Sequence, residues 1–166
     1  MTKLTAKAFT LVELLVVITI IMILTTFVSL NLTSAKKTAR DNKRISDAQL
    51  LASALDQYAA SNARLYLCPG GGCIADDSTS QFVEITPAST IYGSLSTYIN
   101  PVPTEVLTTQ GYKYFYAYRK DGRKASIIIT KFETGNKLCN ITNGNLPKEV
   151  SDYRDQLGTA CYYVSR

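Results

Sequence analysis

The most constraining feature of this sequence is a long apolar run near its amino terminus. Residues 14 to 35 carry no charged side chain, and Leu, Ile and Val dominate the first half of the run. As a helix rising 1.5 Å per residue, this run would be about 33 Å long. The hydrocarbon core of a bilayer is about 30 Å thick and needs roughly 20 apolar residues to cross it, so the run is long enough. A secretory signal peptide has a shorter apolar core and is cut after it. The run therefore predicts a membrane-spanning helix.

One acidic residue, Glu13, stands directly before this run, between Val12 and Leu14. An ionised carboxylate inside a bilayer costs roughly 2.5–3.5 kcal/mol on insertion scales and needs a cationic or hydrogen-bonding partner. No basic residue lies within the apolar segment. Glu13 therefore either reaches the headgroup region from its place near the start of the segment, or needs a partner that the segment does not supply.

The residues around Glu13 follow a short leader that contains Lys3 and Lys7, and they read Ala8-Phe9-Thr10-Leu11-Val12-Glu13-Leu14-Leu15-Val16-Val17-Ile18. This string resembles the processing signal of type IV prepilins and type II secretion pseudopilins. The resemblance implies that a membrane peptidase cuts between Ala8 and Phe9 and methylates the new amine; the family usually has Gly where Ala8 stands. It also implies that Glu13 meets the Phe9 amine of a neighbouring subunit in a filament, so that a buried charge becomes paired.

The resemblance divides the chain into three parts. Residues 1–8 form the prepilin leader peptide, residues 9–35 the transmembrane and filament-core helix, and residues 36–166 a globular pilin head. The expected fold is α+β and pilin-like. Its long amino-terminal helix spans the membrane with the apolar half, and packs the amphipathic half on a small antiparallel sheet.

The long helix is also expected from the residues themselves, because no Pro occurs before Pro69 and one helix can run from Phe9 to about Asn62. In its second half, apolar residues recur at helical spacing and form one stripe: Ile45, Ala48, Ala52, Leu55 and Ala59. Polar residues are expected on the opposite face: Lys43, Asp47, Asp56 and Gln57. A single apolar face favours packing against a sheet, and a coiled-coil dimer is the alternative.

Strand patterns follow in the second half of the chain. Tyr occupies positions 112, 114, 116 and 118, an Asp121-Gly122 turn comes next, and Ala125 begins a second apolar run. This pattern predicts an antiparallel hairpin. Tyr162-Tyr163-Val164 predicts a last short strand, whereas residues 68 to 103 read mostly as loop. The tyrosines either pack on the helix and on neighbouring strands, or form a stacking platform for single-stranded nucleic acid.

The chain has four cysteines, Cys68, Cys73, Cys139 and Cys161, and no CxxC pair. Two disulfides are their natural use outside the cytoplasm, and four buried thiols are the alternative in a reducing compartment. Four cysteines allow three pairings. We favour Cys68–Cys73 with Cys139–Cys161, because each pair closes a loop without joining distant segments. The second pair also resembles the carboxy-terminal disulfide loop of many pilins.

Two basic clusters carry much of the formal net charge of +5. The first contains Lys36, Lys37, Arg40, Lys43 and Arg44. The second surrounds the Asp121-Gly122 turn and contains Arg119, Lys120, Arg123 and Lys124. Contact with nucleic acid is one interpretation, since Lys and Arg bind phosphates. A charged collar beside the membrane and a solvated hairpin tip are the interpretation that we favour.

The chain contains no His, which excludes imidazole metal sites and Ser-His or Cys-His nucleophile pairs. We therefore expect no enzymatic activity and no cofactor. Secretion pseudopilins often bind calcium in a carboxy-terminal loop. Only Glu149, Asp152 and Asp155 offer oxygen ligands there, without a calcium-binding spacing, so no metal is expected.

The expected function is that of a structural subunit of a type IV pilus, held in the cytoplasmic (inner) membrane as a single-pass precursor and displayed on the cell surface after assembly. The expected partners are copies of the chain, through Phe9 and Glu13, the prepilin peptidase, the pilus or secretion assembly platform and the membrane, with DNA as a weaker expectation. A type II secretion pseudopilin is the first alternative. A single-pass membrane-anchored extracellular receptor or binding domain is an alternative of another class.

Overall fold

A computed structural model describes residues 9–70, 72–135, 138–141, 146–157 and 160–166, with the side chains of residues 27–31 left out. The chain divides into two compact units, Met1–Lys37 and Thr38–Arg166. The long helix α1 spans Leu11–Ser61 and contributes to both units. The sequence prediction of one helix from Phe9 to about Asn62 is therefore confirmed within two residues at each end.

In the first unit, three threonine hydroxyls of α1 bond to the helix's own backbone. The hydroxyl of Thr19 donates to the carbonyl of Val16 over 2.8 Å, and the hydroxyls of Thr25 and Thr26 both donate to the carbonyl of Met22 over 2.9 Å. Such bonds satisfy polar side chains on an otherwise apolar helix. Among the described residues, no helix has the length and apolarity needed to cross a membrane. The membrane span expected at residues 9–35 stays a prediction.

In the second unit, four antiparallel strands form one sheet in the order β1-β2-β3-β4. The strands are β1 (Ser80–Glu84), β2 (Tyr114–Arg119), β3 (Ala125–Ile129) and β4 (Tyr162–Ser165). The predicted hairpin is β2–β3, and the predicted last strand is β4. Three further helical segments are α2 (Thr90–Leu95), the 3-10 turn η1 (Thr108–Gln110) and α3 (Lys148–Leu157).

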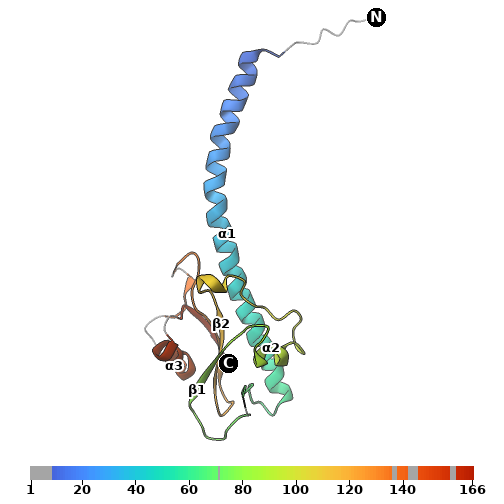
Figure 1. Ribbon diagram of the computed structural model, residues 1–166, viewed down its shortest axis with the longest axis vertical. Helices are drawn as coiled ribbons and strands as arrows, with labels where there is room; N and C mark the ends of the chain where they lie inside the picture. Colours follow the sequence, from blue (N-terminus) through green and yellow to red (C-terminus); the bar gives the residue numbers. More distant parts are fainter. Residues whose placement is uncertain (1–8, 71, 136–137, 142–145, 158–159) are drawn as a thin grey trace, which may run out of the picture. The chain divides into compact units, whose positions relative to one another are not determined.

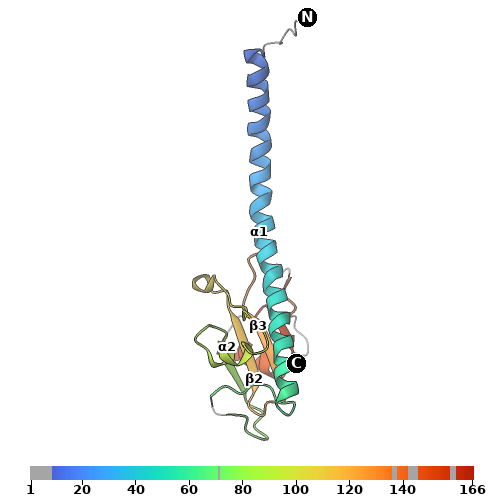
Figure 2. The same ribbon diagram turned by 90° about the vertical axis from the view of Figure 1, so that its right-hand side faces the viewer.

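The two faces of the sheet carry different helices (Figures 1 and 2). On one face, Tyr114, Tyr116 and Tyr118 are buried in the same cluster as the predicted apolar stripe of α1 and residues of α2. The hydroxyls of Tyr116 and Tyr118 donate to the carbonyls of Leu67 and Pro69 over 2.6 and 2.9 Å. These three tyrosines therefore pack against the helix and do not form an exposed stacking platform. Tyr112 lies before β2, and the Arg44 guanidinium lies over its ring, 4.3 Å from the ring centroid.

On the other face of the sheet, α3 packs its apolar side over the centre of β2 and β3. Val150 and Tyr153 of α3 form a buried cluster with Ala117 of β2 and Ile128 of β3. The Tyr153 ring also meets Phe82 of β1 edge to face, with ring centroids 5.4 Å apart.

The sequence prediction missed β1, α2 and α3. β1 and α2 lie in the stretch that reads as loop, and β1 gains its structure by pairing all five of its residues with β2. Such a strand depends on a distant partner, which a local pattern does not reveal.

Candidate assembly site at the start of the long helix

The first turn of α1 is closed by two of its own side chains. Thr10 precedes the first helical residue, Leu11, and Glu13 is the third residue of the helix. The amide and hydroxyl of Thr10 donate to the Oε2 oxygen of Glu13 over 2.9 and 2.7 Å. In return, the Glu13 amide donates to the Thr10 hydroxyl oxygen over 3.2 Å. This reciprocal pair is a capping box, which satisfies backbone donors that the helix itself leaves open.

The capping box uses only one oxygen of the Glu13 carboxylate. Both bonds from Thr10 end on Oε2, whereas Oε1 accepts no hydrogen bond from any residue that the structure describes. Glu13 is exposed, and so is the neighbouring Phe9, at 74%. The carboxylate is thus held in a fixed place by its own chain and still has one oxygen available for an outside donor. Ala8, the other residue of the expected cleavage site, lies outside the described residues.

The apolar side chains of the first unit are exposed rather than buried. Among the described side chains, fourteen large ones are between 44% and 80% exposed: Phe9, Leu11, Val12, Leu14, Leu15, Val16, Val17, Ile18, Ile20, Ile21, Met22, Ile23, Leu24 and Leu32. A contiguous apolar surface of this kind marks a contact with lipid or with another protein.

Within the second unit, the start of its share of α1 carries a buried network of charges. Asp41 is 0% exposed and Arg44 3%. Asp41 accepts hydrogen bonds from the Arg44 guanidinium (2.6 Å), from the amides of Glu133 and Thr134 (3.0 and 2.8 Å) and from the Thr134 hydroxyl (2.8 Å). Arg44 also donates to Glu105 over 2.6 and 3.3 Å and to Glu133 over 3.0 Å. The network fastens two loops to the helix.

The network also holds its carboxylates in the charged form. Burial would raise the pKa of Asp41, but hydrogen bonds from Glu133 and Thr134 lower it overall. Burial would also raise the pKa of Glu105, but the hydrogen bond from the Arg44 guanidinium lowers that pKa overall. The guanidinium of Arg40 lowers the pKa of Glu133 to about 2. All three carboxylates are therefore ionised at neutral pH.

These contacts correct two sequence expectations about α1. Arg44 does not belong to a solvated basic collar, because it lies inside the network, and Arg40 is paired with Glu133. Asp47 does not lie on the solvent face, since it is only 9% exposed and accepts a hydrogen bond from the Tyr114 hydroxyl over 3.3 Å. Buried charges of this kind need several partners, and these partners are distant in sequence.

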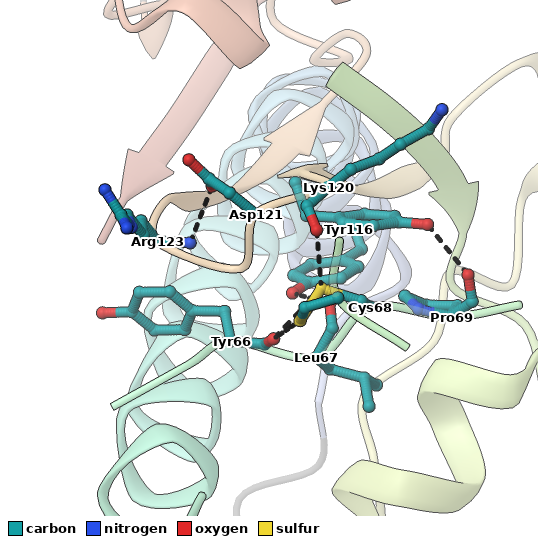
Figure 3. The surroundings of a disulfide bond; sticks show 10 residues. Tyr66, Leu67, Cys68, Pro69, Tyr116, Lys120, Asp121 and Arg123 are labelled. Carbon is teal, nitrogen blue, oxygen red and sulfur yellow. Dashed lines mark hydrogen bonds between the residues drawn. A yellow bond between two sulfur atoms is a disulfide. The ribbon is translucent and has the colours of Figure 1, made fainter. Parts of the chain in front are cut away.

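The structure contains both favoured disulfides, Cys68–Cys73 and Cys139–Cys161, with Cα–Cα distances of 5.2 and 4.7 Å. Figure 3 shows the first one between the Tyr66–Pro69 segment and the tip of the β2–β3 hairpin. Backbone hydrogen bonds join the hairpin tip to both sides of the disulfide loop: Tyr66 donates to Gly122 over 2.7 Å, and Ile74, which follows Cys73, donates to Lys120 over 2.8 Å.

A glycine is required at the point of closest approach between the disulfide and the hairpin tip. Gly122 has a φ of 70°, and a Cβ atom there would lie 2.6 Å from the Cys73 Sγ atom. Gly alone tolerates both the backbone conformation and the contact. The hairpin tip is therefore braced by the disulfide loop rather than free in solvent.

The four basic residues of the hairpin tip do not form one surface. Arg119 is paired with Asp121 of its own turn, Lys120 lies 3.5 Å from Asp77, and Arg123 lies 3.9 Å from Asp76. Arg119 and Lys124, but not Lys120 or Arg123, line a cavity together with residues of α3 and the end of β4.

The carboxylates considered as metal ligands are engaged separately. Glu149 is 2% exposed and accepts from the Ser126 hydroxyl over 2.9 Å, Asp152 pairs with Lys148, and Asp155 pairs with Arg154. In the part of the chain that the structure describes, no three His, Cys, Asp or Glu side chains gather into a group that could hold a metal ion.

Sequence reasoning missed the role of Thr10 and the charge network. The spacing Thr10-x-x-Glu13 ahead of an apolar run is the sequence pattern of a capping box and would have identified Thr10. The network has no such pattern, because Asp41 and Arg44 meet residues that are 61 to 93 positions away.

Comparison with known proteins identifies the amino-terminal segment. Residues 4–29 match the prokaryotic N-terminal methylation motif, which is the signature of type IV pilins and pseudopilins. No curated protein and no solved structure matches the chain. The motif covers Phe9, Thr10 and Glu13, and it supports a pilin-like or pseudopilin precursor without choosing between the two.

Proposed function

We propose, from the methylation motif at residues 4–29, that this chain is the precursor of a type IV pilus subunit. The prepilin peptidase removes residues 1–8 and methylates the amine of Phe9. Residues 9–35 hold the subunit in the cytoplasmic membrane until the assembly platform adds it to a filament on the cell surface. The chain has a structural role and no enzymatic one.

The geometry of Glu13 fits this proposal, because only one of its two carboxylate oxygens is hydrogen-bonded within the described residues. Its Oε2 oxygen is bound by Thr10, and its Oε1 oxygen accepts nothing from the described residues. A carboxylate that enters an apolar filament core needs a donor for its remaining oxygen. The methylated Phe9 amine of a neighbouring subunit is a cation of the right kind, and it is created by the processing that the motif implies.

The two disulfides favour a pilus over a secretion pseudopilus, and the absence of a calcium-binding sequence pattern favours it too. A pseudopilin remains the second candidate, because it shares the motif and the polymerisation step. The two differ in the location of the processed protein, which reaches surface filaments only in the first case.

The proposal is tested with Glu13→Ala in cells that assemble filaments. We expect normal or improved membrane insertion, because a charge is removed from an apolar segment, and loss of the subunit from sheared filaments. Thr19→Ala is the matched control, since Thr19 lies on the same helix but bonds only to the Val16 carbonyl. The control is expected to assemble normally.

A filament yield of Glu13→Ala equal to that of the wild type would remove the proposed role of the carboxylate. It would favour the single-pass receptor or binding domain, which needs no partner for Glu13. Equal loss in Glu13→Ala and Thr19→Ala would show that the segment tolerates no change, and would contradict a specific role for the charge.

A further inference from the structure

A cavity of about 390 Å³ lies between the β2–β3 hairpin, α3 and the end of β4. Four cationic residues from different parts of the chain are among those that line it: Arg119, Lys124, Lys148 and Arg166. A cavity of this size is typical of a site for a small ligand or for one group of a larger one.

Among the described residues that line this cavity, Glu149 has the one acidic side chain, and it is almost fully buried. Its Oε1 oxygen accepts a hydrogen bond from the Ser126 hydroxyl over 2.9 Å. The carboxylates that pair with the lining cations, Asp121, Asp152 and Asp56, are not among the lining residues. The cavity wall itself is therefore predominantly cationic.

The lining cations keep donors that their own partners do not use. Arg119 bonds to Asp121 through one Nη atom, and each guanidinium has five N–H groups. Nε of Arg119 is buried without a hydrogen-bond partner among the described residues, whereas Nε of Arg166 lies 2.8 Å from Oδ2 of Asp56 and forms an ion pair with it. Lys124 is exposed and has no ion-pair partner within the described part of the chain.

We propose that this cavity binds a phosphate ester, supplied by a nucleic-acid strand or by a free nucleotide. A phosphate group presents oxygens in several directions, so donors from separate segments can reach it together, whereas a carboxylate lies in one plane. Arginine forks bind phosphate with two parallel hydrogen bonds, and lysines add point charges. The positive end of the α3 dipole, at Lys148, acts in the same direction.

This site differs from the contact surface that the sequence suggests at the hairpin tip. The structure retains Arg119 and Lys124, adds Lys148 and Arg166, and excludes Lys120 and Arg123, which face Asp77 and Asp76. The proposal does not depend on filament formation, because the cavity lies within the second unit.

The test is fluorescence anisotropy of the full chain in detergent micelles over a salt series, with a short labelled DNA oligonucleotide and, separately, a labelled mononucleotide. The double variant Lys124→Gln/Lys148→Gln is expected to bind about tenfold more weakly and to lower the salt slope by about one or two. Arg123→Gln is the matched control, since it removes a cation from the same hairpin outside the cavity and should bind as the wild type does.

Glu149→Gln supplies a second test with the opposite sign. The amide oxygen of Gln still accepts from the Ser126 hydroxyl, but the negative charge is gone, so both probes should bind more tightly. Circular dichroism confirms that each variant is folded before binding is measured.

Binding of the oligonucleotide alone identifies a nucleic-acid strand as the source of the phosphate, and binding of both probes identifies a nucleotide-sized site. The proposal is overturned if neither probe binds the wild-type chain. It is also overturned if Arg123→Gln weakens binding as much as the double variant does, because the attraction would then be general charge and not the cavity.

Discussion

The amino-terminal and carboxy-terminal halves of α1 each begin with a carboxylate, Glu13 in the first unit and Asp41 in the second. Asp41 is fully buried and accepts four hydrogen bonds from Arg44, Glu133 and Thr134. Glu13 is exposed and accepts two, both from Thr10 and both on one oxygen. Within the described residues, the chain thus supplies hydrogen-bond donors to both carboxylate oxygens of Asp41, but to only one carboxylate oxygen of Glu13.

The apolar side chains of the two halves follow the same division. In the second half, Leu51 and Leu55 are 0% exposed and pack against the sheet. In the first half, Leu14 and Leu15 are more than half exposed. The comparison teaches that the second unit buries its apolar side chains within one chain, whereas the first unit leaves them exposed, as the proposed filament subunit would.

The largest expected effect comes from disrupting the buried charge network of Asp41 and Arg44 in the second half of α1. Arg44→Met leaves Asp41, Glu105 and Glu133 buried without their shared cation, and should lower the free energy of unfolding of the head by about 3–5 kcal/mol. Chemical unfolding of the full chain in detergent, followed by circular dichroism, measures the loss.

Lys43→Met is the matched control for this change. Lys43 is adjacent on the same helix, but its side chain is 70% exposed, so its ion pair with Asp47 contributes at most about 1 kcal/mol. Equal effects of the two substitutions would mean that the buried network adds nothing beyond ordinary surface charge.

Acid should weaken the same network by a smaller amount. The pKa of Glu133 is about 2 in the folded chain, against an ordinary value of 4.5, because of the Arg40 guanidinium. The folded state therefore binds fewer protons than the unfolded state between these values, and its stability falls as the pH drops from about 4.5 to 2. We expect a loss of about 1–3 kcal/mol in unfolding experiments; a flat profile over this range would contradict it.

The smallest expected effect on stability comes from removing the capping box of Thr10 and Glu13 at the start of α1. Thr10→Val removes the hydroxyl of the capping box and should destabilise the first turn of α1 by about 0.5–2 kcal/mol, whereas Thr10→Ser keeps the hydroxyl. Faster amide hydrogen exchange at residues 11 to 14 in the Val variant alone is the expected result. Unchanged exchange in Thr10→Val would mean that Thr10 does not hold Glu13 in place. As a control, the free energy of unfolding of the head should be the same in the wild type, Thr10→Val and Thr10→Ser.

The parts of this molecule that were predicted from the sequence are those with a local pattern. The 3.6-residue stripe on α1, the alternation and Asp121-Gly122 turn of β2–β3, and the Phe9 to Glu13 string each lie within a short stretch. The parts that were missed depend on distant partners. Strand β1 exists because it pairs with β2, and Arg44 is buried because Glu105 and Glu133 reach it from two loops.

The central claim is that this chain is processed before Phe9 and that the resulting amino terminus enters a filament. Mass spectrometry of the amino-terminal peptide tests it most directly, with sheared surface filaments and membranes analysed separately. The account predicts an N-methylated Phe9 peptide in the sheared fraction. The same peptide confined to membranes would favour the pseudopilin, and a leader that still begins at Met1 in both fractions would contradict processing and the filament role with it.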